Sequence, residues 1–207
     1  MPASFTVVYL HGFLSSPASA KGRELRAAAE AAGWGFEAPD LNLPPREADA
    51  LLTDLFEGRA PEARRRTFVT GSSLGGFWAL RAARRFGLPA AVVNPCLEPW
   101  RFVPAHTGRQ RIYGTGRWIE VLPGFAEDFR ALARETPPAP RDPADLLVLL
   151  SSADEVLDWR EAARELGASP RILSVGDDHR MERFAQYLPA VAAFFARRAA
   201  ENPLQVR

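Results

Sequence analysis

Short runs of apolar residues recur along the chain and predict the strands of a buried sheet. They occupy residues 6–10, 67–70, 90–93 and 146–150, with weaker runs at 35–39 and 171–175. Strands exposed on one face alternate polar and apolar residues, whereas continuous apolar runs are typical of strands covered on both faces. We therefore expect a mostly parallel central sheet.

Helical patterns alternate with these runs. We expect helices at about 17–32, around Leu51 to Phe56, at 74–86, at 159–166 and at 181–200, the last with an irregularity before Pro189. Ser15, Ser16 and Pro17 are start signals for the first helix, and Gly33 is its stop signal. Strands and helices that alternate with short connections predict an α/β fold with helices on both faces of the sheet.

The alternation lapses between about residues 96 and 143. This stretch holds aromatic residues among prolines and glycines, namely Trp100, Phe102, Tyr113, Trp118, Phe125 and Phe129. A long connection inside a compact domain is usually functional, so we expect a lid-like insertion within a single domain that spans residues 1–207. Its aromatic residues would either line an acyl-binding pocket or anchor the insertion to the domain.

Composition narrows the class of protein. The chain has 26 basic and 25 acidic residues and a formal net charge of +1, which gives no reason to expect nucleic acid or a membrane as a partner. The single cysteine, Cys96, excludes an internal disulfide and offers no metal-ligand spacing. Because the chain runs directly into a strand and has no long apolar stretch, we expect a cytoplasmic protein without a bound metal or cofactor.

Candidate chemistry begins where residues 67–70 end. Gly71, Ser73 and Gly75 form the G-x-S-x-G pattern of a nucleophile elbow, in which a strained turn between a strand and a helix exposes the serine hydroxyl. The glycines are expected because a Cβ at either position would press on neighbouring backbone. Ser72 is the rival nucleophile, but it occupies the x position and should point away from the cleft.

Two further candidates follow other predicted strands. Asp154 comes after residues 146–150, and His179 comes after residues 171–175, so both reach the edge of the sheet where Ser73 lies. The order serine, acid, histidine is the order of the α/β-hydrolase fold. In that arrangement the imidazole takes the serine proton and the carboxylate orients the imidazole.

The acid has alternatives. These are Glu155, Asp158, Asp177 and Asp178. Asp154 is preferred because it lies in the turn directly after the strand. Asp158 stands where it would cap the next helix, and Asp178 is too close to His179 in sequence to orient its ring easily.

An oxyanion hole completes the predicted active site. The backbone N–H groups of Phe13, in the loop after the first strand, and Leu74, after the nucleophile, are its expected donors. We interpret His11 as a histidine that braces this loop and His106 as a solvated or lid histidine. Lys21 is either a contact for an anionic substrate or a solvated surface lysine.

Together these motifs resemble the YqiA-type esterases, which are small bacterial α/β-fold hydrolases. The resemblance rests on residues 9–13 with 15–17, 71–76, 92–95, 154–158 and 176–179 and extends over nearly the whole chain. It implies Ser73 as nucleophile, Asp154 as acid and His179 as base, with carboxylesterase activity and activity toward acyl thioesters. The chain departs from the family pattern around residues 106–125 and at Asp177 and Asp178, which bears on the choice of substrate.

The sequence therefore predicts a serine hydrolase that cleaves small-molecule carboxylic esters through an acyl-enzyme. A thioesterase is the alternative within enzymes, since the triad defines acyl transfer and says little about the leaving group. A catalytically silent α/β-hydrolase domain that binds a ligand is the alternative from another class, because a fold does not imply a function.

Overall fold

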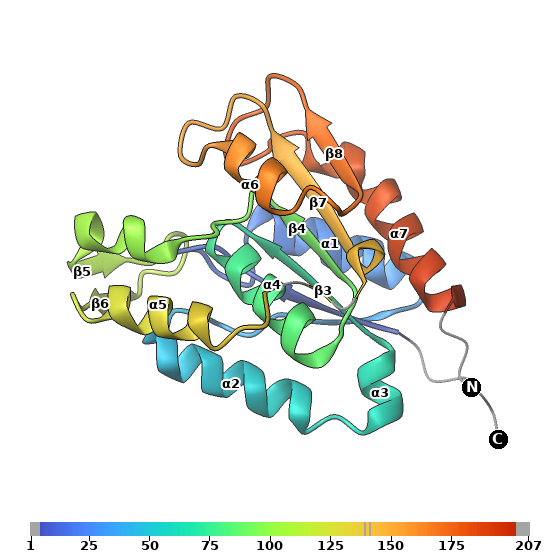
Figure 1. Ribbon diagram of the computed structural model, residues 1–207, viewed down its shortest axis with the longest axis horizontal. Helices are drawn as coiled ribbons and strands as arrows, with labels where there is room; N and C mark the ends of the chain where they lie inside the picture. The colour runs from blue at the N-terminus through green and yellow to red at the C-terminus, as the bar shows by residue number, and fades with distance from the viewer. Residues whose placement is uncertain (1–4, 139, 141, 202–207) are drawn as a thin grey trace.

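A six-stranded parallel sheet forms the centre of the molecule (Figure 1). The structure is a computed structural model that describes residues 5–138, 140 and 142–201. Its strands are β1 (Thr6–Leu10), β2 (Gly35–Glu37), β3 (Thr67–Ser72), β4 (Ala90–Val93), β7 (Leu146–Ser151) and β8 (Arg171–Ser174). They are arranged in the order β2-β1-β3-β4-β7-β8. Every residue of β3, β4 and β7 is buried, as the continuous apolar runs predicted.

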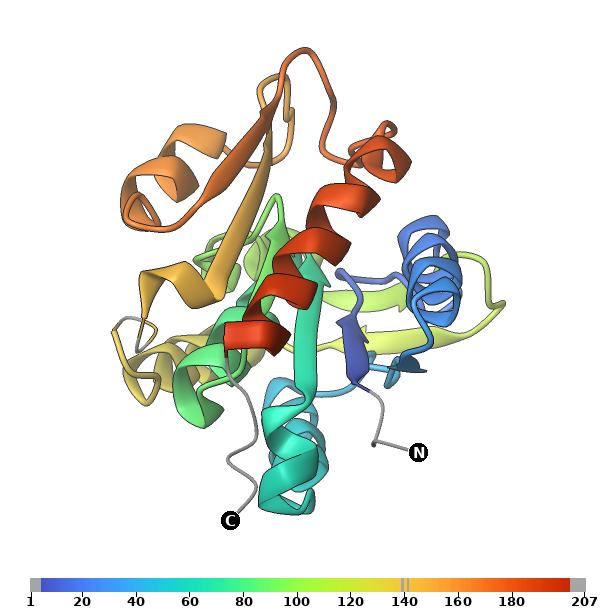
Figure 2. The same ribbon diagram turned by 90° about the vertical axis from the view of Figure 1, so that its right-hand side faces the viewer.

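Helices cover both faces of this sheet. On one face lie α1 (Ala20–Ala31) and α7 (Leu188–Glu201), and Figure 2 shows α7 running across the strands. The other face carries α2 (Pro45–Glu57), α4 (Leu74–Phe86) and α6 (Trp159–Glu165), with the short α3 (Pro61–Arg65) following α2. The predicted α/β architecture is therefore confirmed. Among the helices that the structure describes, none is long and apolar enough to cross a membrane.

The segment between β4 and β7 has secondary structure of its own. It contains two 3-10 turns at Pro99–Arg101 and Val103–His106, the antiparallel hairpin of β5 (Gly108–Arg111) and β6 (Trp118–Val121), the helix α5 (Phe125–Arg134), and a 3-10 turn at Pro143–Asp145. Phe125 and Phe129 are buried, and the ring of Phe129 lies 5.5 Å from that of Phe77 on α4. Tyr113 and Trp118 on the hairpin are exposed. The aromatic residues of this segment thus divide between anchors and surface.

Three element boundaries differ from the prediction. α1 begins at Ala20 because Ser19 is its N-cap, with its hydroxyl accepting from the N–H of Gly22 at 3.2 Å. The short helix α3, which was not predicted, begins at Pro61, where the missing N–H of proline costs nothing. The C-terminal helix α7 begins at Leu188 and not at residue 181, and the irregularity expected before Pro189 is a 3-10 turn at Phe184–Tyr187.

Candidate active site

Ser73 lies at a strained corner between β3 and α4. Its φ of 56° and ψ of −121° are in a region that non-glycine residues rarely adopt. Neighbouring backbone holds it there: the Ser73 N–H donates to Val93 O at 3.0 Å, and its carbonyl accepts from the N–H groups of Gly76 and Cys96 at 2.8 and 2.9 Å. The backbone that carries the hydroxyl is therefore fixed by the end of β4, the loop that follows it and the first turn of α4.

The glycines of the elbow are required by close approach. A Cβ on Gly75 would lie 1.9 Å from Leu10 O, and a Cβ on Gly71 would lie 2.0 Å from Gly75 O. Neither glycine has a positive φ, so the unusual dihedral angles of this turn belong to Ser73 itself. The glycines allow α4 to pack directly against the backbone of β1 and β3.

The three predicted triad residues come together. His179 Nε2 lies 3.0 Å from Ser73 Oγ, and His179 Nδ1 lies 2.8 Å from Asp154 Oδ2. The His179 side chain is 15% exposed and that of Asp154 is 1% exposed. Both distances are within ordinary hydrogen-bond range. The imidazole thus bridges the serine and a buried carboxylate that reaches the site from a different strand.

Asp154 is held by the loop that follows β7. Its second oxygen, Oδ1, accepts from the N–H groups of Val156 and Leu157 at 2.9 and 2.8 Å. These bonds fix the orientation of the carboxylate toward His179. The buried charge is therefore compensated on both oxygens.

The alternative acids have other partners. Glu155 accepts from the backbone N–H of His179 at 2.9 Å, and this hydrogen bond lowers the pKa of the Glu155 carboxyl. Asp158 caps α6 by accepting from the N–H of Arg160 at 3.0 Å, as expected. Asp177 accepts from Ser174 Oγ at 3.0 Å and from the N–H of Glu182 at 3.1 Å, so it shapes the loop around His179.

The predicted oxyanion donors flank Ser73. Leu74 is the first residue of α4, where N–H groups lack partners within the helix. Phe13 follows Gly12, on which a Cβ would lie 3.2 Å from Ser72 O and 3.3 Å from Ser73 Cβ, so this loop rests against the elbow. Within the described part of the chain, neither the Phe13 nor the Leu74 N–H donates a hydrogen bond. Both remain available to an oxyanion.

His11 supports the loop that carries Phe13. It is 2% exposed, its Nε2 accepts from the N–H of Leu41 at 2.9 Å, and its Nδ1 donates to Gly12 O at 2.9 Å. Burial lowers the pKa of His11, which keeps the ring neutral and Nε2 free to accept. These contacts agree with the bracing role that the sequence suggested.

Asn94 is a residue whose role the sequence analysis missed. It is buried, with a φ of 43°, at the end of β4. Its Oδ1 accepts from the N–H of Ser151 at 2.8 Å, and its Nδ2 donates to Ser151 Oγ and to His179 O at 2.9 Å each. Asn94 therefore ties β7 and the backbone of His179 to β4. A polar residue directly after a buried strand was the signal available in the sequence.

The remaining sequence candidates lie near the site without joining it. Lys21 Nζ donates to Arg180 O and lies 5.9 Å from the Phe184 ring, so it fastens α1 to the His179 loop, and burial lowers its pKa. His106 Nδ1 lies 2.9 Å from Phe102 O. Burial raises the pKa of the Cys96 thiol to about 12, which makes it unreactive. The described residues contain no group of His, Cys, Asp and Glu side chains that could hold a metal.

A narrow apolar cavity of about 30 Å³ adjoins the oxyanion loop. Phe13, Leu74 and Trp78 line it from the domain, and the segment between β4 and β7 contributes Val103, Ile119, Val121, Phe125 and Phe129. Phe125 and Phe129 thus serve as anchors and as cavity lining together.

Known solved structures share this architecture. A monoacylglycerol lipase from Paleococcus ferrophilus matches with a TM-score of 0.69 and 16% identity over 95% of this chain and 97% of that chain. Est1E from Butyrivibrio proteoclasticus matches with a TM-score of 0.69 and 13% identity over 97% of this chain and 90% of that chain. The chain therefore has the α/β-hydrolase fold, as predicted.

Sequence comparison identifies the family. A "UPF0227 protein" from Serratia proteamaculans is 25% identical over 196 residues, which cover 91% of this chain and 97% of the relative. One from Yersinia pseudotuberculosis is 26% identical over 198 residues, with the same coverage. The model of the family described as "Uncharacterised protein family (UPF0227)" matches residues 6–196. This family is the YqiA-like one that the motifs resembled. The chain thus belongs to the UPF0227 family of α/β-hydrolase-fold proteins.

Proposed function

We propose that the protein is a serine hydrolase that cleaves carboxylic esters of small molecules. Ser73 Oγ attacks the ester carbonyl carbon while His179 Nε2 takes the hydroxyl proton, and a tetrahedral oxyanion forms. Asp154 accepts from His179 Nδ1–H and stabilises the imidazolium. The distances of 3.0 Å from Ser73 Oγ to Nε2 and 2.8 Å from Nδ1 to Asp154 Oδ2 carry this proposal.

The backbone N–H groups of Phe13 and Leu74 would hold the oxyanion. Loss of one such donor typically costs on the order of 3 kcal/mol of transition-state stabilisation. The support for this assignment is that both N–H groups are unpaired among the described residues and flank the elbow.

The intermediate then collapses. The bond from carbon to the leaving oxygen breaks, the alkoxide takes the proton from His179 Nε2, and the acyl group remains on Ser73. Water loses a proton to Nε2 as it attacks the acyl carbon, and collapse of the second intermediate releases the acid and restores the Ser73 hydroxyl. All protons move through His179, so proton transfer requires no further acid or base.

The first experiment is reaction with a fluorophosphonate, followed by intact mass and peptide mapping. We expect one adduct, on Ser73, that is absent from Ser73→Ala and present in Ser72→Ala, whose serine is buried within β3. No adduct on folded protein would overturn the proposal and favour a silent binding domain. If Ser73 reacts, a matched panel of oxygen esters and thioesters decides between esterase and thioesterase.

A further inference from the structure

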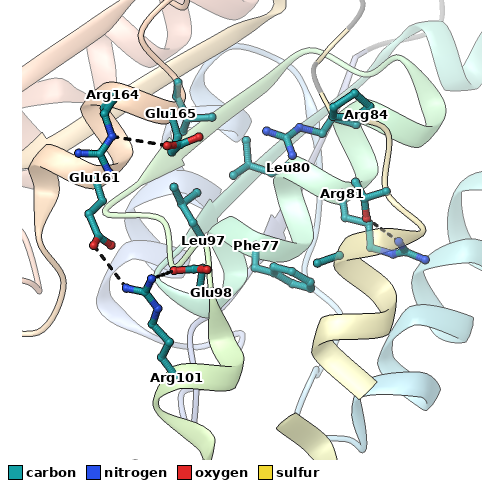
Figure 3. A pocket seen from close by; sticks show the side chains of 14 residues that line it. Phe77, Leu80, Arg81, Arg84, Leu97, Glu98, Arg101, Glu161, Arg164 and Glu165 are labelled. Carbon is teal, nitrogen blue, oxygen red and sulfur yellow. Dashed lines mark hydrogen bonds and ion pairs between the residues drawn. The ribbon is translucent and has the colours of Figure 1, made fainter. Parts of the chain in front are cut away.

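A second hollow, of about 450 Å³, lies on the side of the sheet that carries α4 and α6 (Figure 3). Its apolar lining includes Phe77 and Leu80 from α4 and Leu97 from the segment after β4. Its charged lining consists of Arg81, Arg84, Glu98, Arg101, Glu161, Arg164 and Glu165. Ser73, Asp154 and His179 are absent from this set of described residues. The volume is within the range of small-molecule sites, about 300–1,000 Å³.

The carboxylates around this hollow already have arginine partners. Arg101 pairs with Glu98 and, at 3.3 Å, with Glu161. Glu165 pairs with Arg164 at 3.5 Å. These pairs, drawn in Figure 3, involve every glutamate of the lining and none of them involves Arg84.

Among the described residues that line this hollow, Arg84 is the arginine without an ion pair. Within the described part of the chain its guanidinium has neither a hydrogen bond nor an ion pair, and its Nε is buried without a partner. Burial lowers the pKa of Arg84, and no nearby carboxylate raises it. Arg81, one turn earlier on α4, is by contrast bound to Asp49 at 2.6 Å. Figure 3 shows the Arg84 guanidinium above Leu80, at the edge of the apolar floor.

Arg84 is half-buried, and a buried Nε without a partner costs free energy that a ligand could recover. We propose that this hollow binds a small amphipathic carboxylate, with its carboxylate group on Arg84 and its apolar body on Phe77, Leu80 and Leu97. A single negative charge matches the one unpaired cation. A phosphate dianion would suffer repulsion from Glu161 and Glu165, which line the same hollow.

The hollow also shares lining residues with another hollow beside the loops that carry Ser73 and Asp154. Leu97, Glu98, Arg101 and Glu161 line a neighbouring hollow of about 400 Å³ that includes Cys96 and Leu157. The Cys96 N–H bonds Ser73 O, and the Leu157 N–H bonds Asp154. A ligand on Arg84 would therefore lie in a hollow that shares four lining residues with the one that contains Cys96 and Leu157.

Calorimetric titration with octanoate and its neutral isostere octanamide tests this proposal. We expect the wild-type protein to bind octanoate at least about tenfold more tightly than octanamide, because a charged hydrogen bond is added. Arg84→Gln should lose that preference. Arg111→Gln, an exposed arginine on β5, is the matched control and should keep it. The proposal would be overturned if Arg84→Gln kept the wild-type preference for octanoate. It would also be overturned if the wild-type protein bound no octanoate in a titration that can detect a Kd of about 1 mM.

A second readout separates binding from folding. Arg84→Gln removes a half-buried charge that has no ion pair among the described residues, so its melting temperature should equal or exceed that of the wild type. Arg84→Lys keeps the charge and should retain part of the octanoate preference. Repeating the titration on Ser73→Ala makes the result independent of the proposed hydrolysis, since Ser73 does not line this hollow.

Discussion

Two adjacent carboxylates have different roles around His179. Asp154 binds the ring at Nδ1 from a buried position, whereas the exposed Glu155 binds the backbone N–H of the same residue. The first contact sets the tautomer and orientation of the imidazole. The second only helps to place the loop. Sequence neighbours of the same chemical type therefore make a matched pair for mutation.

Asp154→Asn is expected to lower kcat on the order of 10⁴-fold, because an amide leaves the imidazole in the wrong tautomer for accepting the serine proton. Oδ1 can still accept from Val156 and Leu157, so the loop should stay folded. Glu155→Gln should lose less than about tenfold, since one exposed hydrogen bond to the backbone is weakened. Initial rates on one ester, with circular dichroism of each variant, check this. Equal losses in the two variants would contradict the assignment of the acid.

His11 makes stability depend on pH. The pKa of His11 in the folded protein lies below the ordinary value of about 6.5. Just below pH 6.5, His11 is therefore protonated in the unfolded chain and still neutral in the folded protein. Stability should therefore be fully present above pH 6.5 and decline as the pH falls toward the lowered pKa. His11→Gln keeps an acceptor for the Leu41 N–H and cannot titrate. Urea unfolding at pH 7.5 and 5.5 should show a larger loss for wild type than for this variant, and equal losses would refute the prediction.

The sequence could point to the three residues of the proposed triad because each lies in the loop or turn after a predicted strand. The sequence did not single out the acid as clearly as the serine and the histidine. Other carboxylates follow the same predicted strands, namely Glu155, Asp158, Asp177 and Asp178. The structure separates them by contacts that depend on loop conformation. Asn94 was missed for a related reason: its partners, Ser151 and His179, are far away in sequence.

At the scale of elements, the elbow depends on how closely α4 approaches β1. Gly75→Ala would place a Cβ 1.9 Å from Leu10 O, and backbone on both sides is fixed. We expect a loss of about 3 kcal/mol or more in the free energy of unfolding, at the upper end of overpacking effects. Gly124→Ala is the control, because nothing lies within 4 Å of its added Cβ, and it should stay within about 0.5 kcal/mol of wild type. Similar melting temperatures for the two variants would contradict this account.

Asn94 joins the ends of β4 and β7 to the loop after β8. Asn94→Gly tolerates the positive φ but removes the bonds to Ser151 and His179, so the imidazole should lose its fixed position. We expect kcat to fall roughly 10- to 100-fold with a smaller change in KM, as for a misplaced catalytic group. Ser169→Ala, a buried serine before β8 at the opposite edge of the sheet, should leave both constants unchanged. A folded Asn94→Gly variant with wild-type kcat would exclude a positioning role.

Strands were predicted more accurately than helix starts or the hairpin. A strand such as β7 is buried on both faces, so its composition alone marks it. The start of α1 depends on which serine caps it, and Ser19 also bonds the Tyr9 hydroxyl, a contact from another element. The hairpin of β5 and β6 carries exposed Arg109, Arg111 and Trp118, and its one covered face gives no continuous apolar run.

At the scale of the whole molecule, the segment between β4 and β7 is fastened to the domain through Arg81. This buried arginine on α4 binds Asp49 of α2 at 2.6 and 2.9 Å. It also donates to Leu132 O of α5 and to Thr136 Oγ1, both at 2.6 Å. One guanidinium therefore links α2, α4 and α5. The position of the segment between β4 and β7, which lines one side of the apolar cavity, depends on that link.

Arg81→Leu should detach the segment between β4 and β7 more readily than it unfolds the rest of the domain. Breaking a buried pair typically costs about 3–5 kcal/mol, and we expect the lower end because Asp49 keeps Arg85 at 3.3 Å. Trypsin should then cleave the segment between β4 and β7 faster than the rest of the chain, as mass spectrometry of the fragments would reveal. Arg130→Lys, at an exposed arginine of α5, keeps the trypsin site and should leave the cleavage rate unchanged. Cleavage spread evenly over the chain in Arg81→Leu would mean that the segment and the domain unfold together.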